Sequence, residues 1–211
     1  MFKFILATFC VFCIACQSTQ GHLEKSKAQF YKEFDITSSH KKKTKVTLLP
    51  HQRVPIEYLY KNKDIKGLLI NHGLGTGKTF LSLGFCEKYP QRKKIILIPD
   101  SLVSNWTIQM REFGVSHDTS YEIITYSKAP EKLLGKDLSQ SILIIDEVHK
   151  FLEYLNSPVE KVSEEYIKVY LNLKNSFKIM VLTGTPIYNN VNDIGYIFNL
   201  VTGIDIYSAL N

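Results

Sequence analysis

Five short apolar runs, each continuous rather than alternating, constrain the fold of this chain more than any other feature of its sequence. They are GLLIN (67–71), KKIILIP (93–99), YEIITY (121–126), SILIID (141–146) and KIMVLT (178–183). A strand that is apolar on both faces is buried on both faces, which is typical of parallel sheets covered by helices. Segments with helical spacing separate the runs, so right-handed parallel crossovers are expected. The pattern predicts an α/β domain, with a mostly parallel sheet and helices on both faces.

The expected helices begin after Pro50 and then cover 79–89, 101–113, 164–177 and 192–201, with Ser101 as a candidate N-cap. The chain has 211 residues, of which 45% are hydrophobic, which suits one globular domain with a substantial core. Its net charge of +6 favours an acidic partner, such as nucleic acid or a phosphate-rich ligand, although weakly. No internal repeat is present.

The first 46 residues differ from the rest. Residues 1–21 contain Lys3 and an apolar run over 4–16, too short to span a bilayer, in the form of a secretory signal. The segment CIAC (13–16) resembles a bacterial lipoprotein cleavage box, with Cys16 as the lipid acceptor. The alternatives are a metal site formed by Cys10, Cys13 and Cys16, and an apolar leader or upstream stretch outside the fold. Residues 22–46 are polar and lysine-rich and are expected to form a linker or basic arm. The domain is therefore expected over 47–205.

The segment INHGLGTGKT (70–79) follows the first apolar run and precedes a helix. A tight glycine-containing loop there lets backbone N–H groups converge on an anion, and the helix N-terminus adds partial positive charge. Lys78 is expected to reach the β- and γ-phosphates of a nucleotide, and Thr79 offers its hydroxyl to Mg²⁺. The strict phosphate-loop pattern has glycine at position 72, and a flexible turn is the alternative. The candidate nucleotide-binding residues of the loop are His72, Gly73, Leu74, Gly75, Thr76, Gly77, Lys78 and Thr79.

Two adjacent carboxylates end the fourth apolar run. In open parallel sheets, ligands bind outside the carboxyl ends of the strands, where Asp146 and Glu147 are expected to lie. Asp146 can hold Mg²⁺, directly or through water. Glu147 can orient and deprotonate an attacking water. A surface turn would explain the acidity but not its pairing with the glycine loop.

A third motif, TGTP (183–186), follows the fifth run and places the hydroxyls of Thr183 and Thr185 at the same edge. These hydroxyls can bond the carboxylate motif and relay the state of the γ-phosphate, and they are the candidate coupling residues. Taken alone, the segment would be interpreted as a turn.

Together the three motifs resemble those of a superfamily-2 helicase-like ATPase, over roughly residues 48–201. GLGTGKT resembles motif I, DEVH (146–149) resembles motif II, the DExH box, and TGTP resembles motif III. The resemblance adds His149 to the catalytic candidates Lys78, Asp146 and Glu147, although a histidine alone is more often structural. It is most detailed for the Swi/Snf branch, in IPDSLVSNWTIQMREF (98–113), ITYS (124–127) and LTGTPIYNNVNDIGYIFNLV (182–201). LLPHQ (48–52) resembles the adenine-contacting element and places Gln52 at the base.

The resemblance implies a RecA-like lobe that binds ATP and Mg²⁺ and couples hydrolysis to movement along double-stranded DNA. It also implies a second RecA-like lobe with arginine fingers, which we expect in trans or missing from this chain. His72 and Val148 depart from the family pattern, and Trp106 is expected to pack rather than to stack on bases.

Alternatives are a restriction-system translocase, a viral transcription ATPase, or a truncated nucleotide-binding or interaction module. An exported lipoprotein would lack ATP, so we expect an intracellular protein, and a membrane partner only if the leader is genuine.

Overall fold

The computed structural model of the chain describes residues 46–73, 75–184 and 192–204. Within these ranges five strands form a single sheet in the order β1-β5-β4-β2-β3, and every neighbouring pair is parallel. The strands are β1 Gly67–Asn71, β2 Lys93–Ile98, β3 Tyr121–Thr125, β4 Ser141–Asp146 and β5 Lys178–Thr183. The predicted α/β class and the parallel sheet are confirmed.

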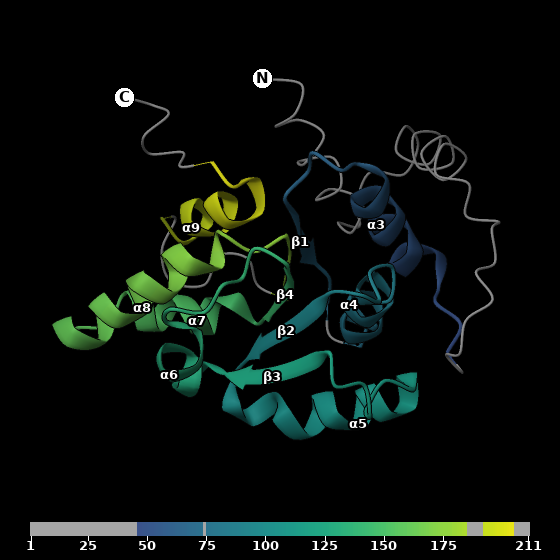
Figure 1. Ribbon diagram of the computed structural model, residues 1–211, viewed down its shortest axis with the longest axis horizontal. Coiled ribbons are helices and arrows are strands. Elements are labelled where there is room, and N and C mark those ends of the chain that lie inside the picture. The colour runs from purple at the N-terminus through teal and green to yellow at the C-terminus, as the bar shows by residue number, and fades with distance from the viewer. Residues whose placement is uncertain (1–45, 74, 185–191, 205–211) are drawn as a thin grey trace.

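Helices cover both faces of this sheet. Figure 1 shows α3, α4 and α5 gathered on one side, and α6, α7, α8 and α9 on the other. Two short 3₁₀ helices, η1 and η2, follow β2 and β3. The bounds are α3 Pro50–Lys61, α4 Lys78–Cys86, η1 Asp100–Leu102, α5 Val103–Phe113, η2 Tyr126–Lys128, α6 Ala129–Leu133, α7 Val148–Leu155, α8 Glu160–Leu173 and α9 Asn192–Thr202.

The order of the strands explains this division. The chain moves outward from β1 to β2 and β3, and then returns to β4 and β5. Since parallel crossovers are right-handed, the helices of the outward path lie on one face and those of the return path on the other. The order in which strands are added to the sheet reverses after β3.

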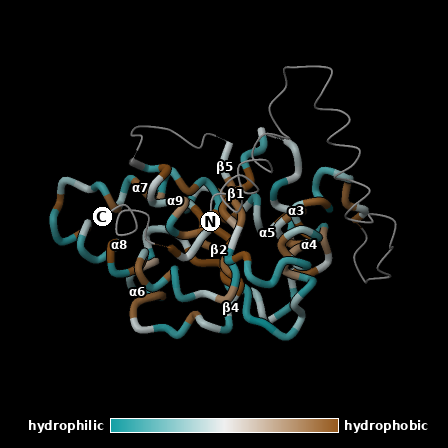
Figure 2. Tube along the Cα trace, turned by 90° about the horizontal axis from the view of Figure 1, so that it is seen from above, coloured by the Kyte–Doolittle hydropathy of each residue, from teal (hydrophilic) through white to brown (hydrophobic). Residues whose placement is uncertain are grey.

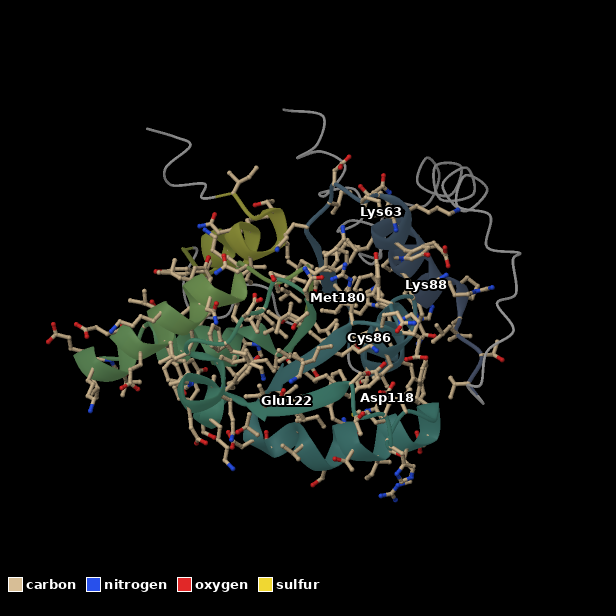
Figure 3. The ribbon with its side chains drawn as sticks, viewed as in Figure 1. Lys63, Cys86, Lys88, Asp118, Glu122 and Met180 are labelled. Carbon is tan, nitrogen blue, oxygen red and sulfur yellow. The ribbon has the colours of Figure 1, made fainter. Side chains whose placement is uncertain are left out.

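Each face of the sheet has its own hydrophobic core. Alternate residues of β4 point to opposite faces, so Leu143 and Ile145 join the core under α6 to α9, whereas Ile142 and Ile144 join the core under α3 to α5. The strands appear as the brown, apolar centre of Figure 2. In Figure 3 the labelled Cys86 of α4 lies in the interior, within the core under α3 to α5.

The carboxyl ends of the strands bring the three sequence motifs together. Asn71, the last residue of β1, pairs with Thr183, and Asp146, the last residue of β4, pairs with Leu182. The segments that follow β1, β4 and β5 therefore leave neighbouring strands at one edge of the sheet. By the alternation in β4, Asp146 belongs to the face covered by α3, α4 and α5.

Several boundaries differ from the sequence-based expectation. Helices α6 and α7 were not predicted, and α8 begins at Glu160 instead of 164. Ser101 is not an N-cap, because it lies inside η1, and α5 has Leu102 at its N-cap position without a side-chain bond. The η1 turn lets the chain leave β2 before the longer helix starts.

Parts of the predicted organisation lie outside the described residues. These are the leader over 1–21, the linker over 22–46 except for Val46, and the site residues Leu74 and Thr185. In the described part of the chain, no helix combines the length and the hydrophobicity that crossing a bilayer requires.

The strand pair β1–β5 is packed tightly at its start, which gives a test of the fold. A Cβ atom added to Gly67 would lie 2.5 Å from the backbone oxygen of Ile179, an atom held in the sheet. We expect Gly67→Ala to lower the free energy of unfolding by about 1–3 kcal/mol, as overpacking of a core does. Gly73→Ala is the matched control, because a Cβ there would meet nothing within 4 Å. Urea unfolding measures both, and equal losses would contradict the tight β1–β5 contact.

Candidate nucleotide-binding site

The loop between β1 and α4 has the backbone of an anion cradle. Gly75 and Gly77 have φ values of 75° and 77°, in the left-handed region that glycine adopts without strain. Gly77 is the N-cap of α4, so the free N–H groups of the first helical turn begin directly after it. The hydroxyl of Thr76 donates to the oxygen of Gly73 over 2.8 Å and closes the turn. The loop can therefore present backbone donors to a phosphate group.

Lys78 and Thr79 begin α4 beside this loop. The Lys78 ammonium donates to the backbone oxygens of His72 at 2.8 Å and Gly73 at 3.2 Å, so it lies against its own loop. These acceptors are neutral, and a phosphate would form stronger, charge-assisted bonds with the same ammonium. The Thr79 side chain is buried at the same helix end.

Helix α3 fixes the loop from the other side. The Gln52 amide nitrogen donates to the backbone oxygens of Thr76 at 3.3 Å and Gly77 at 3.1 Å. The Gln52 amide oxygen accepts the Leu49 N–H at 2.8 Å at the start of α3. His51 adds a ring nitrogen 3.1 Å from the same Thr76 oxygen. Gln52, predicted to contact adenine, is thus bonded to the backbone at both ends of its amide.

His72 connects the loop to β5. Its backbone N–H donates to the oxygen of Thr183 over 3.2 Å, which extends the β1–β5 pairing one residue beyond the strands. The His72 pKa is lowered, first by burial and then by the nearby His51 and Lys78. The side chain of Thr183, a predicted coupling residue, is fully buried at this junction.

Asp146 is the most constrained carboxylate of the site. Its Oδ2 accepts the indole N–H of Trp106 at 2.9 Å, and its Oδ1 accepts the backbone N–H of Glu147 at 3.0 Å. Its backbone oxygen accepts the hydroxyl of Tyr126. Only 7% of Asp146 is exposed, and its pKa is raised to about 6. Burial is the main cause and the charge of Glu147 adds to it, whereas Trp106 and Lys78 limit the rise.

Glu147 stands at the beginning of α7 in an unusual conformation. Its φ of 53° is in the left-handed region, and it is the one residue other than glycine with positive φ in the described ranges. Such strain is concentrated at functional sites. The Glu147 Oε2 lies 3.4 Å from Nδ1 of His149, so His149 contacts the candidate base.

The donor set fits a nucleotide bound with Mg²⁺. Mg²⁺ binds oxygen ligands and usually takes one or two carboxylates together with substrate phosphates. Asp146 provides a buried carboxylate, and the buried residue Thr79 provides a hydroxyl. Among the described residues no lysine or arginine forms an ion pair with Asp146, so a bound cation would stabilise its buried charge. No group of three His, Cys, Asp or Glu side chains suited to an all-protein metal site occurs among the described residues.

Sequence reasoning missed two residues of the site, Trp106 and Tyr126. Trp106 is fully buried, as predicted for a packing residue, but it also donates to Asp146. The available signal was chemical: a buried indole N–H or phenol O–H usually finds a hydrogen-bond partner. No local pattern indicated that Asp146 would accept the hydrogen bonds of both residues.

Comparisons with known proteins identify relatives among viral helicases and transcription factors. No protein-family model matches the chain. The chain is 25% identical over 185 residues to R563 of Acanthamoeba polyphaga mimivirus, provisionally named an ATP-dependent RNA helicase, covering 71% of this chain and 32% of that protein. It is 26% identical over 174 residues to the early transcription factor 70 kDa subunit of monkeypox virus, covering 74% and 26%.

A solved structure shows the same fold. It is the Sulfolobus solfataricus SWI2/SNF2 ATPase core in complex with double-stranded DNA, with a TM-score of 0.60, 18% identity, and coverage of 81% of this chain and 39% of that one. The RecA-like fold expected from the motifs is confirmed. The chain is a homologue of the helicase-like ATPases of superfamily 2, and it spans about a quarter to a third of the length of the two viral relatives.

The buried Asp146 predicts a pH-dependent stability. The unfolded chain releases the Asp146 proton near the ordinary pKa of 3.8, whereas the folded chain keeps it up to about pH 6. Stability therefore falls as pH rises between these values, and the whole loss is present above pH 6. We expect Asp146→Asn to be more stable than the wild type at pH 8 by at most about 3 kcal/mol, and by less at pH 5. Urea unfolding without Mg²⁺ tests this, and a gain that does not change with pH would contradict it.

Proposed function

We propose that this homologue of helicase-like ATPases is the ATP-binding lobe of a nucleic-acid-dependent ATPase. The observation that carries the proposal is the convergence, at one sheet edge, of a left-handed glycine loop, Lys78, Thr79 and the buried Asp146. Ligands of open parallel sheets bind at this edge. The names of the relatives, which refer to helicases, a transcription factor and a DNA complex, support a role with nucleic acid.

Each side chain has a defined part in the proposed reaction. Lys78 exchanges its loop carbonyls for the β- and γ-phosphates, and Thr79 and Asp146 hold Mg²⁺, which when bound neutralises developing phosphate charge. Glu147 orients a water molecule and accepts its proton as that water attacks the γ-phosphorus and ADP leaves. His149 is proposed to orient the Glu147 carboxylate, and the 3.4 Å distance from its Nδ1 to Glu147 Oε2 supports this role. Thr183 and Thr185 are the proposed coupling residues.

Recognition of adenine by Gln52 is part of the proposal. The amide already bonds Leu49, Thr76 and Gly77, so contact with a base requires the exchange of at least one of these bonds. Such an exchange would link the arrival of the base to the conformation of the phosphate loop. Gln52 therefore has two proposed tasks, which are to hold the loop and to select the base.

The kind of nucleic acid distinguishes two finer proposals. A Swi/Snf-type translocase would act on double-stranded DNA. A viral helicase or transcription ATPase would act on RNA or on DNA that is being transcribed. The sequence relatives support the viral branch, and the finer motif resemblance supports the Swi/Snf branch.

Net charge does not decide between these branches. Residues 1–45 hold eight of the 26 basic side chains and three of the 20 acidic ones, so little of the net charge of +6 belongs to the later domain. Binding of nucleic acid by the domain would therefore depend on individual groups at its surface.

The first test of the function is the phosphate contact of Lys78. Loss of one charge-assisted bond costs about 1.5–3 kcal/mol, so we expect Lys78→Ala to weaken ATP binding by about ten- to a hundredfold. Titration with a fluorescent ATP analogue in the presence of Mg²⁺ measures the Kd. Lys168→Ala, an exposed lysine of α8, is the control and should bind like the wild type. Equal affinity of the Lys78 variant and the wild type would contradict the phosphate-loop assignment.

The second test concerns catalysis by these 211 residues on their own. They provide Lys78, Thr79, Asp146 and Glu147, but the resemblance places the arginine fingers on a facing lobe. Such a finger contributes about 10³–10⁵ in kcat in related systems, which corresponds to roughly 4–7 kcal/mol of barrier. We therefore expect little or no phosphate release by the 211 residues, with or without double-stranded DNA or RNA.

A lobe supplied in trans should restore the rate. The nucleic acid that stimulates the restored activity would then decide between the two branches. Glu147→Gln should abolish the restored activity and leave ATP binding intact. Robust turnover by the 211 residues alone, stimulated by either nucleic acid, would contradict the need for a facing lobe.

A further inference from the structure

Trp106 reaches the candidate metal site from a helix that contributes no residue to the phosphate loop. It lies in α5, on the same buried stripe as Met110 and Phe113, and its side chain is fully buried. Its indole N–H donates to Oδ2 of Asp146 at 2.9 Å. A hydrogen bond to an ionised acceptor is stronger than one between neutral groups. This contact therefore stabilises the ionised Asp146 carboxylate in addition to satisfying the buried indole N–H.

The two bonds on the Asp146 carboxylate together define its orientation. Oδ1 accepts the N–H of Glu147, and Oδ2 accepts the N–H of Trp106, so neither oxygen can turn without losing a bond. A carboxylate has about four lone-pair positions, so capacity remains on both oxygens for a metal or for water. Tyr126 holds the main chain at the same residue through the Asp146 backbone oxygen.

We propose that Trp106 is a positioning residue that holds the Asp146 carboxylate in the orientation with which it binds the Mg²⁺ of a nucleotide complex. This inference rests on the proposed function and assigns to Trp106 a task beyond packing. Because Mg²⁺ demands near-ideal octahedral geometry, a carboxylate free to rotate binds it less well. Groups that hold a ligand in place usually change metal affinity by about 10–100-fold when they are removed.

The decisive variant is Trp106→Phe, which keeps an aromatic ring in the core and removes the N–H donor. We expect the Mg²⁺ concentration needed for half-maximal binding of a fluorescent ATP analogue to rise about tenfold, or roughly 1.4 kcal/mol. With EDTA in place of Mg²⁺, the affinity for the analogue should equal that of the wild type, because the phosphate loop and Lys78 are unchanged.

A matched control separates this effect from the general loss of a hydrogen bond. Tyr170→Phe removes the bond from the Tyr170 hydroxyl to the backbone oxygen of Tyr196, over 3.0 Å, between α8 and α9. This variant should keep the Mg²⁺ dependence of the wild type. If Trp106→Phe weakens binding equally with Mg²⁺ and with EDTA, the role of Trp106 is structural and the proposal is overturned.

A second measurement needs no change at Trp106, in case the variant does not fold. Trp106 is the single tryptophan of the chain, so its indole N–H gives one assignable proton–nitrogen correlation in NMR spectra. We expect this signal to shift in Asp146→Asn. In the wild type it should also shift when Mg²⁺ is added to the ATP-analogue complex, with the same midpoint as binding. A signal that moves in neither experiment overturns the proposal.

The same binding measurements distinguish the proposed function from the role of Trp106. A wild-type chain that binds no ATP analogue at any Mg²⁺ concentration would overturn the proposed function, and this inference with it. A wild-type chain that binds with Mg²⁺, but whose Mg²⁺ dependence is unchanged in Trp106→Phe, would overturn only the role of Trp106.

Discussion

The pairing of β5 with β1 on one side and with β4 on the other is the interaction on which the rest of the domain depends. Among the described residues, β1 has no other strand neighbour, so β5 is the strand that joins the phosphate loop to the rest of the sheet. The bond from His72 to Thr183 continues this pairing into the loop. Because β1 and β5 are more than 100 residues apart in the chain, the site can assemble only after distant segments pair, which is typical of slow steps in folding.

The site combines a loop held by several hydrogen bonds with a carboxylate whose charge is disfavoured by burial. Gln52 bonds the loop to α3, and Lys78 bonds the start of α4 to the oxygen of His72. Asp146, in contrast, loses hydration on burial and gains only partial compensation from Trp106 and Lys78. The proposed phosphate site is therefore held by hydrogen bonds, whereas the proposed cation site contains a buried carboxylate whose negative charge is unfavourable without a cation.

The sequence was sufficient for the strands and for the loop, because these are local patterns. Each continuous apolar run became a strand within one residue of its predicted bounds, and Lys78, Thr79 and Asp146 came to one edge as the parallel topology requires. Helix α7 was not predicted although Val148, Phe151, Leu152 and Leu155 have helical spacing, because its eight residues hold little more than two turns of that pattern. The bond between Trp106 and Asp146 joins residues 40 positions apart, and no local pattern specifies it. The same holds for Lys178, which the fold buries so that its ammonium donates to the backbone oxygen of Lys63 at 2.8 Å.

The left-handed backbone of Glu147 has a consequence for how this sequence could change over generations. A glycine at position 147 would adopt the φ of 53° without the roughly 1–2 kcal/mol that a side chain costs there. A lineage under selection for a stable fold alone would thus tend to replace Glu147, since most proteins lie only a few kcal/mol above the threshold of stability. Replacement of Glu147 by glycine or asparagine in a related protein would therefore be an early sign that this protein has lost the catalytic reaction but kept the fold.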